Sequence, residues 1–228
     1  IGAGEVVGFL GPNGAGKTTT MRMLTGFISA TEGVIRIAGA DLFRDGLKAR
    51  RAIGYLPETL PLYPEMTPAS YLDFVAKLKG VPRARRKELV EQALSRCGLL
   101  DVSRREIRQL SKGFRQRIGL AQAIVHEPEV LVLDEPTVGL DPIQIREIRA
   151  LIRELAFEGG QTILLSTHIL AEVEAICQRA ILLNHGSKVL DQPLSEMVSS
   201  GASLEEVFTK VMTREDHETS EAGAGAVA

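Results

Sequence analysis

The chain has 228 residues, of which 27 are basic and 29 acidic, giving a formal net charge of −2. This length suits one large domain, and the balanced charge argues against a surface that binds polyanions, so no nucleic-acid partner is expected. Cys97 and Cys177 lie far apart without metal-ligand spacing, which predicts two buried, reduced thiols, and no apolar run approaches the length needed to span a bilayer.

The first informative segment follows the apolar run Val6–Leu10 and reads Gly-Pro-Asn-Gly-Ala-Gly-Lys-Thr, which fits the phosphate-binding pattern G-x-x-x-x-G-K-[ST]. Its glycines allow backbone N–H groups to face phosphate oxygens, and the helix expected after it adds a positive N-terminal end. Lys17 can reach the β- and γ-phosphates, and the Thr18 hydroxyl can bind Mg²⁺. The predicted nucleotide-binding residues are Gly11, Pro12, Asn13, Gly14, Ala15, Gly16, Lys17, Thr18 and Thr19.

The first and last residues of the sequence each support a prediction. The chain begins at Ile1 without Met and enters its first strand almost at once, so we expect neighbouring strand residues upstream of this numbering. Residues 213–228 are rich in charged, Ser, Gly and Ala residues, which predicts a disordered tail.

The next segments alternate between short strands and a long helical region. Val34–Ile37 and Ile53–Leu56 read as strands, and four prolines between Pro57 and Pro68 predict a loop. From Pro68 to about Ser111 the pattern is helical, which predicts a lobe inserted between strands. One apolar face is expected to hold Tyr71, Leu72, Val75 and Leu78, and another Leu89, Val90, Ala93, Leu94 and Cys97.

The second half returns to buried strands. Val130–Leu133 and Thr162–Leu165 are continuous apolar runs, as in strands covered on both faces of a parallel sheet, and Ile143–Phe157 between them is amphipathic. Ala180–Leu183 and Lys188–Leu190 predict a hairpin. The alternation predicts the α/β class.

Polar side chains end two of these predicted strands. Asp134 and Glu135 follow Val130–Leu133, and His168 follows the buried strand that ends near Ser166. Ligands bind at the carboxyl ends of strands in open α/β sheets. There Asp134 can hold Mg²⁺ through its water shell, Glu135 can polarise an attacking water, and His168 can donate to a γ-phosphate.

One further segment, Leu110–Arg117, opens a helix expected over Phe114–His126 with Ser111 as its cap. The N–H groups of that helix end would form a second anion site.

Taken together, these segments resemble the ATP-binding subunits of ATP-binding-cassette (ABC) transporters. Gly11–Thr18 matches the Walker A loop of that family, Val130–Glu135 its Walker B strand, and Leu110–Phe114 occupies the place of its L-S-G-G-Q signature. Gly139–Asp141 resembles the D-loop and His168 the switch histidine. The order and spacing of the motifs agree with the family from residue 2 to about residue 191. The amino acids within the motifs are most similar to those of exporters of drugs, polysaccharides or lipids, including the gliding-motility type.

The resemblance implies a P-loop NTPase fold with a mixed, largely parallel sheet and an inserted helical lobe. It implies one nucleotide-binding domain over residues 1–212, with the sheet in about 1–66 and 127–192, the lobe in about 67–126 and C-terminal helices in 193–212. ATP and Mg²⁺ are the implied ligands. The partners would be a transmembrane permease subunit and a second cassette, as homodimer or heterodimer, at the cytoplasmic face of the cell membrane.

Roles follow residue by residue from the matching motifs. The catalytic residues would be Glu135, His168 and Lys17; the metal ligands Thr18, Glu58 and Asp134; and the residues that contact the ATP of the other subunit Ser111, Lys112 and Gly113. Apolar residues of the proline-rich loop, namely Leu60, Leu62, Tyr63 and Met66, would receive a helix of the membrane partner or else pack into their own domain.

The sequence departs from the family in three places. Glu58 stands where the family has Gln, and Lys112 and Phe114 replace Gly and Gln of the signature. The aromatic residue that stacks on adenine normally precedes the loop, and no candidate precedes Phe9. Three alternatives stay open: a soluble ABC ATPase acting on ribosomes or DNA, a different P-loop enzyme such as a kinase or GTPase, and a cassette that binds ATP but hydrolyses it weakly.

Overall fold

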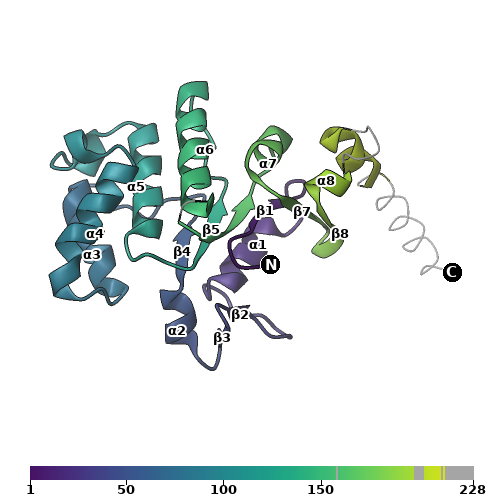
Figure 1. The fold of residues 1–228 in the computed structure, drawn as a ribbon, viewed down its shortest axis with the longest axis horizontal. Helices are drawn as coiled ribbons and strands as arrows, with labels where there is room; N and C mark the ends of the chain where they lie inside the picture. Colours follow the sequence, from purple (N-terminus) through teal and green to yellow (C-terminus); the bar gives the residue numbers. More distant parts are fainter. Residues whose placement is uncertain (158, 198–202, 212, 214–228) are drawn as a thin grey trace.

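The structure is a computed structural model that describes residues 1–157, 159–197, 203–211 and 213. Within them, six strands form one sheet in the order β4-β5-β6-β1-β7-β8 (Figure 1). The sheet strands are β1 (Val6–Leu10), β4 (Ile53–Leu56), β5 (Val130–Asp134), β6 (Thr162–Ser166), β7 (Arg179–Asn184) and β8 (Ser187–Pro193). The first five strands in that order are parallel to one another, and β8 is antiparallel to β7. The predicted mixed sheet and hairpin are thus confirmed.

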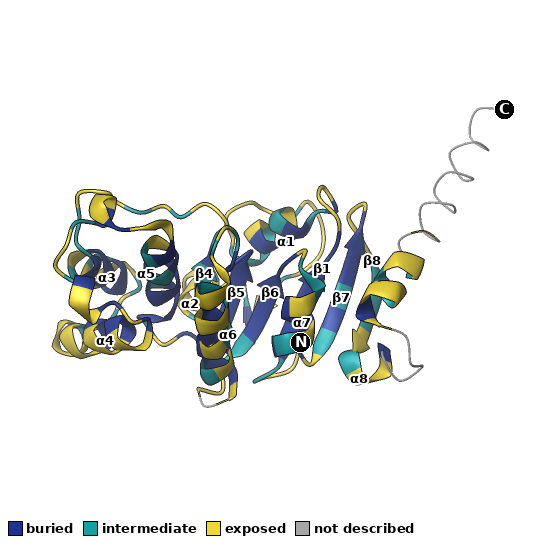
Figure 2. Ribbon diagram, turned by 90° about the horizontal axis from the view of Figure 1, so that it is seen from above, coloured by how far each residue is buried: buried dark blue, intermediate teal, exposed yellow. Residues whose placement is uncertain are grey.

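Helices cover both faces of this sheet. One apolar cluster joins the sheet to α6 (Pro142–Phe157) and α7 (Leu170–Ile176), and the other joins it to α1 (Lys17–Leu24) and α2 (Gly46–Arg51). The central strands are therefore buried along nearly their whole length (Figure 2). That explains why they read as continuous apolar runs rather than alternating ones.

Helices α3 (Pro68–Leu78), α4 (Arg83–Arg96) and α5 (Lys112–Ile124) form a lobe beside β4, with short 3₁₀ turns at Leu100–Val102 and Ile107–Gln109 (Figure 1). Helix α3 begins with a capping box between Thr67 and Ser70. The second predicted apolar face, from Leu89 to Cys97, is buried in the lobe as expected, and both cysteines are buried and free.

Two details differ from the sequence expectation. Leu78 is 69% exposed because the last turn of α3 presents Ala76, not Leu78, to the core. The strand expected over residues 34–37 is confined to β2 (Arg36–Ile37), since a tight turn with positive φ at Ala38 and Gly39 returns the chain at once into β3 (Ala40–Asp41).

Two side chains from the lobe side of the molecule contact a backbone carbonyl oxygen of the edge strand β4. Lys79 Nζ donates to the Ile53 carbonyl over 2.7 Å, and His126 Nε2 lies 3.0 Å from the same oxygen. Burial, followed by the charge of Arg50, lowers the pKa of Lys79 to about 8, and burial, followed by the charge of Lys79, lowers the pKa of His126 to about 4. Both contacts occupy the Ile53 carbonyl, an acceptor that an unpaired edge strand would leave free.

Close approach of the backbones completes this junction. A Cβ at Gly54 would lie 2.1 Å from the carbonyl oxygen of Ala123 in α5, so only glycine lets α5 pack directly on β4.

After β8 the chain continues into α8 (Leu194–Met197) and a further helical stretch over residues 204–211, in which Leu204 is buried. Residues 214–228, where the sequence predicts a tail, lie outside the described residues. None of the helices in the described part of the chain combines the length and apolar character needed to cross a membrane.

Candidate functional site

The predicted phosphate loop, acidic pair and His168 each follow one of three strands that are neighbours in the sheet. In the strand order, β5 is next to β6 and β6 is next to β1, and all three are parallel. Their carboxyl ends therefore meet at one edge, which brings the phosphate-type loop, the acidic pair and His168 together.

The loop between β1 and α1 is shaped by glycines with positive φ. Gly14 has φ 83° and Gly16 has φ 99°, conformations that L side chains rarely adopt. Gly16 is also the N-cap of α1 and supplies no side-chain hydrogen bond to it. The first N–H groups of α1 are thus left without a capping side chain, as in helix ends that bind phosphate.

Lys17 is buried at the start of α1 and folds back over the loop. Its Nζ donates to the carbonyl oxygens of Gly11 and Pro12 over 2.7 and 3.1 Å. A Cβ at Gly11 would lie 2.4 Å from the carbonyl oxygen of Leu183, so the loop is pressed against β7. The ammonium is therefore held over the centre of the loop, where a bound phosphate would meet it.

A cleft of about 420 Å³ opens in front of this loop. It is lined by Asn13, Gly14, Gly16, Lys17, Thr18, Thr19, Glu58, Glu135, Val138 and His168. Six of the nine predicted nucleotide-binding residues lie in this lining. The other three, Gly11, Pro12 and Ala15, belong to the same loop but are not in the lining; Gly11 and Ala15 are buried and Pro12 is exposed.

Glu135 and His168 form a pair across this cleft. His168 Nδ1 lies 2.9 Å from Glu135 Oε1, and the Glu135 backbone has φ 49°, a left-handed conformation uncommon for a residue with a side chain. The Glu135 N–H donates to the Ser166 carbonyl, which fixes this turn against the end of β6.

Two carboxylates of this site have oxygens without protein hydrogen-bond partners. Both oxygens of Asp134 and the Oε2 of Glu135 are buried and unpaired. Unpaired buried carboxylate oxygens are costly, so they point to a ligand that donates to them or neutralises them. Thr18 and Glu58 line the cleft, whereas Asp134 is wholly buried at the end of β5 and is not in the lining. Hydroxyl and carboxylate oxygens are donors of the kind Mg²⁺ prefers, so the chemistry of these residues fits a hydrated Mg²⁺.

The signature-like residues lie apart from the cleft. Ser111 caps α5 through its Oγ, which accepts from the Phe114 N–H over 3.4 Å, and α5 begins two residues earlier than the sequence indicates. Ser111 and Lys112 are exposed, whereas Gly113 is buried beneath Gln144, whose side chain a Cβ at Gly113 would strike. Within one chain, Ser111, Lys112 and Gly113 are not in the cleft lining.

One contact links this segment to the acidic pair. Gln116 in α5 is buried, and its Nε2 donates to the Pro136 carbonyl over 2.8 Å, one residue after Glu135. Nothing in the sequence distinguishes Gln116, because a glutamine in a helix gives no signal until its partner is known.

A buried acid was also missed. Glu172 in α7 accepts from the hydroxyls of Thr137 and Thr167, which adjoin the cleft residues Glu135 and His168 in sequence. The available signal was an acid beside Val173 and Ile176 on the apolar face of a short helix.

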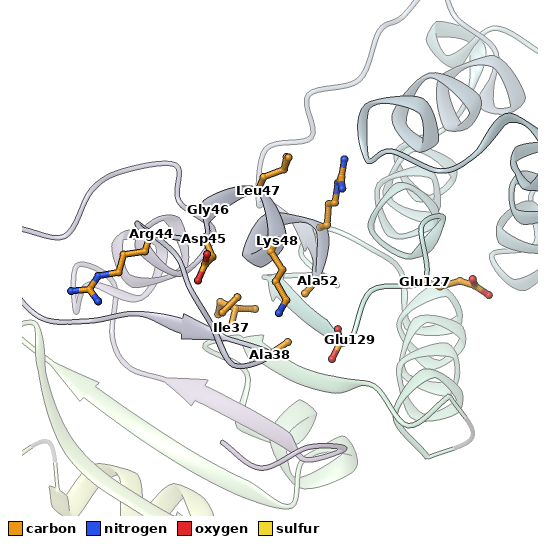
Figure 3. A pocket seen from close by; sticks show the side chains of 12 residues that line it. Ile37, Ala38, Arg44, Asp45, Gly46, Leu47, Lys48, Ala52, Glu127 and Glu129 are labelled. Atoms are coloured by element: carbon orange, nitrogen blue, oxygen red, sulfur yellow. The ribbon is translucent and has the colours of Figure 1, made fainter.

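A second hollow of about 580 Å³ lies elsewhere, between α2 and the turn from β2 to β3 (Figure 3). Lys48 of α2 and Glu129 face it, and Glu129 stands at the start of β5, the strand end opposite Asp134. This hollow is therefore not part of the cleft.

Comparison with known proteins agrees with this geometry. The family model described as ABC transporter matches residues 1–138. The chain belongs to the ABC transporter family. It is 40% identical over 194 residues to the bacitracin transport ATP-binding protein BcrA of Bacillus licheniformis, covering 85% of this chain and 62% of the relative.

The share of a relative's length that matches this chain differs between relatives. The chain is 42% identical over 192 residues to the ABC transporter ATP-binding protein YhcH of Bacillus subtilis, covering 84% of this chain and 61% of that protein. It is 36% identical to the ABC transporter ATP-binding protein NatA of the same organism, covering 94% of this chain and 88% of NatA. The chain thus spans about three fifths of the length of BcrA and YhcH.

Solved structures give the same fold. A structure described as the ATP-binding subunit of an ABC transporter has a TM-score of 0.83 at 32% identity, covering 92% of this chain and 89% of that one. An ATP-binding cassette solved as a dimer in a post-hydrolysis state with ADP and Pi has a TM-score of 0.77 at 27% identity, covering 85% and 87%. The expected α/β cassette fold is confirmed, and the chain is an ATP-binding cassette of its family.

Proposed function

We propose that this chain binds ATP with Mg²⁺, hydrolyses it, and thereby drives transport through a separate transmembrane permease subunit. The observation that carries the proposal is the cleft in which Lys17 and Thr18 face the paired side chains of Glu135 and His168. The relatives named as transporter ATP-binding proteins, and the dimeric neighbour with ADP and Pi, support it.

In this proposal the loop residues bind and orient the phosphates. Lys17 exchanges its contacts with the Gly11 and Pro12 carbonyls for β- and γ-phosphate oxygens, and the uncapped N–H groups of α1 receive the rest of that charge. Asp134, Thr18 and Glu58 would hold Mg²⁺, which supplies a counter-charge to the phosphates when bound.

Glu135 and His168 act on the reacting end of the nucleotide. Glu135 orients a water and takes its proton, with Oε2 as the free acceptor because Oε1 is engaged by His168. His168, whose side chain is half exposed, donates to the γ-phosphate through Nε2–H, the ring nitrogen that does not contact Glu135. The left-handed turn at Glu135 holds its carboxylate in the cleft.

A second cassette would complete the site. Ser111, Lys112 and Gly113 lie outside the cleft of their own chain, so they reach a nucleotide only from another copy or a related subunit. The dimeric solved neighbour supports this arrangement. The proposal therefore includes a head-to-tail homodimer or heterodimer with ATP between the Lys17 loop and the signature residues.

The surface at which the permease subunit would dock includes the loop after β4. An apolar hollow of about 330 Å³ opens there, lined by Phe27, Tyr55, Pro57 and Pro61 among others, and Phe27 is 78% exposed. Of the four loop residues that the sequence offered for docking or for packing, Leu60, Leu62 and Met66 pack against their own core, and Tyr63 is exposed. Docking there would place the cassette at the cytoplasmic face of the cell membrane, and the transport direction proposed is export.

Purification of the complete protein from native membranes in mild detergent, followed by mass spectrometry, tests the partner. We expect a polytopic membrane protein in stoichiometric amount, lost or weakened by Phe27→Asp and unaffected by Leu47→Asp, which changes an exposed apolar residue on α2. Ribosomal or DNA-repair partners without a membrane protein would overturn the transporter proposal.

A further inference from the structure

The carboxylate of Glu172 lies behind the cleft and is more deeply buried than either cleft partner. Its residue is 1% exposed, in helix α7, with Val173 and Ile176 packed beside it. An apolar side chain would pack in this position without the cost of burying a charge. The retention of an acid here therefore calls for an explanation beyond packing.

Both oxygens of this carboxylate accept from threonine hydroxyls on different loops. Thr137 Oγ1 donates to Oε1, and Thr167 Oγ1 donates to Oε2 over 2.8 Å. Arg149 of α6 approaches to 3.8 Å, too far for a direct hydrogen bond. Glu172 thus accepts hydrogen bonds from two hydroxyls and forms only a long ion pair with Arg149.

Each threonine adjoins one partner of the cleft pair. Thr137 follows Glu135 by two residues in the turn after β5, and Thr167 immediately precedes His168 after β6. The Thr167 hydroxyl also accepts from the Ile169 N–H over 3.1 Å, so the backbone on both sides of His168 is tied to the same carboxylate. Glu172 therefore bridges the two loops from outside the cleft lining.

We propose that Glu172 is a positioning residue that, through Thr137 and Thr167, sets the 2.9 Å separation of Glu135 and His168. His168 gains from such support because half of its side chain is exposed, so few packing contacts hold its ring. The inference rests on the proposed function, in which those two side chains act on the γ-phosphate and the attacking water. Misplacement of about 1 Å at such a pair costs about 10²-fold in rate.

The direct test is Glu172→Gln in the complete protein, which keeps the shape but replaces an accepting oxygen by an NH₂ group. We expect kcat for ATP to fall at least tenfold while the KM for MgATP and the affinity for a non-hydrolysable ATP analogue stay within twofold. Glu174→Gln, which changes an exposed acid on the same helix, is the matched control and should leave all of these values unchanged.

The threonines separate positioning from general stability. Thr167→Val and Thr137→Val remove the donors and should lower kcat like Glu172→Gln, whereas Thr167→Ser and Thr137→Ser keep the hydroxyls and should restore it to within about threefold of wild type. Comparison of the valine with the serine variants keeps the test decisive if Glu172→Gln fails to fold.

The inference would be overturned by unchanged kcat in Glu172→Gln, or by valine variants no slower than the serine variants. A loss of nucleotide affinity and melting temperature in step with kcat would likewise assign Glu172 to stability alone. The proposed function fails separately, if Glu135→Gln itself retains wild-type turnover.

Discussion

His168 Nδ1 and Glu135 Oε1 lie 2.9 Å apart although their residues are separated by 33 positions in the chain. The contact joins the loops after β5 and β6, which are adjacent parallel strands in register from Val130–Thr162 to Asp134–Ser166. Since the register fixes where each strand ends, a slip of either strand by one residue would turn the side chains of that strand to the other face of the sheet and separate the pair. The pair is thus a direct product of the strand pairing.

Replacing Glu135 by Gln removes the proposed base while keeping the size of the side chain and its contact with His168. We expect ATP turnover to fall by about 10²-fold to 10⁴-fold, since general-base catalysis contributes that much. Binding of ATP should persist, and the variant should accumulate as an ATP-bound dimer in size-exclusion chromatography. Turnover at the wild-type rate would remove Glu135 from the base role.

A methyl group at Gly54 tests the junction between β4 and the helical lobe. Gly54→Ala would place a Cβ 2.1 Å from the Ala123 carbonyl oxygen, so α5 must move away from the sheet. We expect a loss of about 1–3 kcal/mol or more in the free energy of unfolding, measured in urea. Gly2→Ala meets no atom closer than 3.6 Å and should be neutral; equal effects of the two changes would contradict the packing argument.

The partly buried His126 makes stability depend on acid pH. Its pKa is lowered from 6.5 to about 4, by burial and then by Lys79, so between those values the unfolded chain binds more protons than the folded one. Stability should therefore fall as the pH drops from 6.5 to 4, by an amount on the order of 3 kcal/mol from this group.

Urea unfolding of wild type and His126→Gln over this pH range measures that contribution. The variant lacks the titrating ring, so its stability should fall less on acidification than that of wild type. His185→Gln, which changes an exposed histidine in the turn between β7 and β8, is the control and should follow wild type. Parallel curves for wild type and His126→Gln would disprove the assignment.

The two cysteines should be inert in the folded protein. Both are buried and free, and burial raises the pKa of each thiol to about 12. Since the thiolate is the reactive form, we expect no labelling by a thiol-specific disulfide reagent at pH 8 and two labelled thiols per chain once guanidinium unfolds it. Rapid labelling without denaturant would mean that the lobe or α7 opens readily.

Several features of this cassette follow from local sequence. Gly14 and Gly16 dictate the loop because few other residues adopt their φ values, and the apolar runs of β1, β5 and β6 indicate strands covered on both faces. The placement of Asp134, Glu135 and His168 at strand ends follows from the same runs. The roles of these residues remain predictions that the experiments above test.

Other features depend on contacts that join distant parts of the chain. The strand order β4-β5-β6-β1-β7-β8 places Glu172 behind the cleft, Gln116 beside Pro136, and Lys79 and His126 against Ile53. It also decides that Leu60, Leu62 and Met66 pack inward, whereas Leu78 stays exposed.

Backbone conformations and apolar faces are readable from the sequence, because each is set by a residue and its near neighbours. The tertiary structure alone decided which buried polar groups meet. A hydrogen bond between residues 20 to 73 positions apart, such as those of Gln116 and His126, leaves no periodic trace in the sequence and forms only once strands and helices have packed.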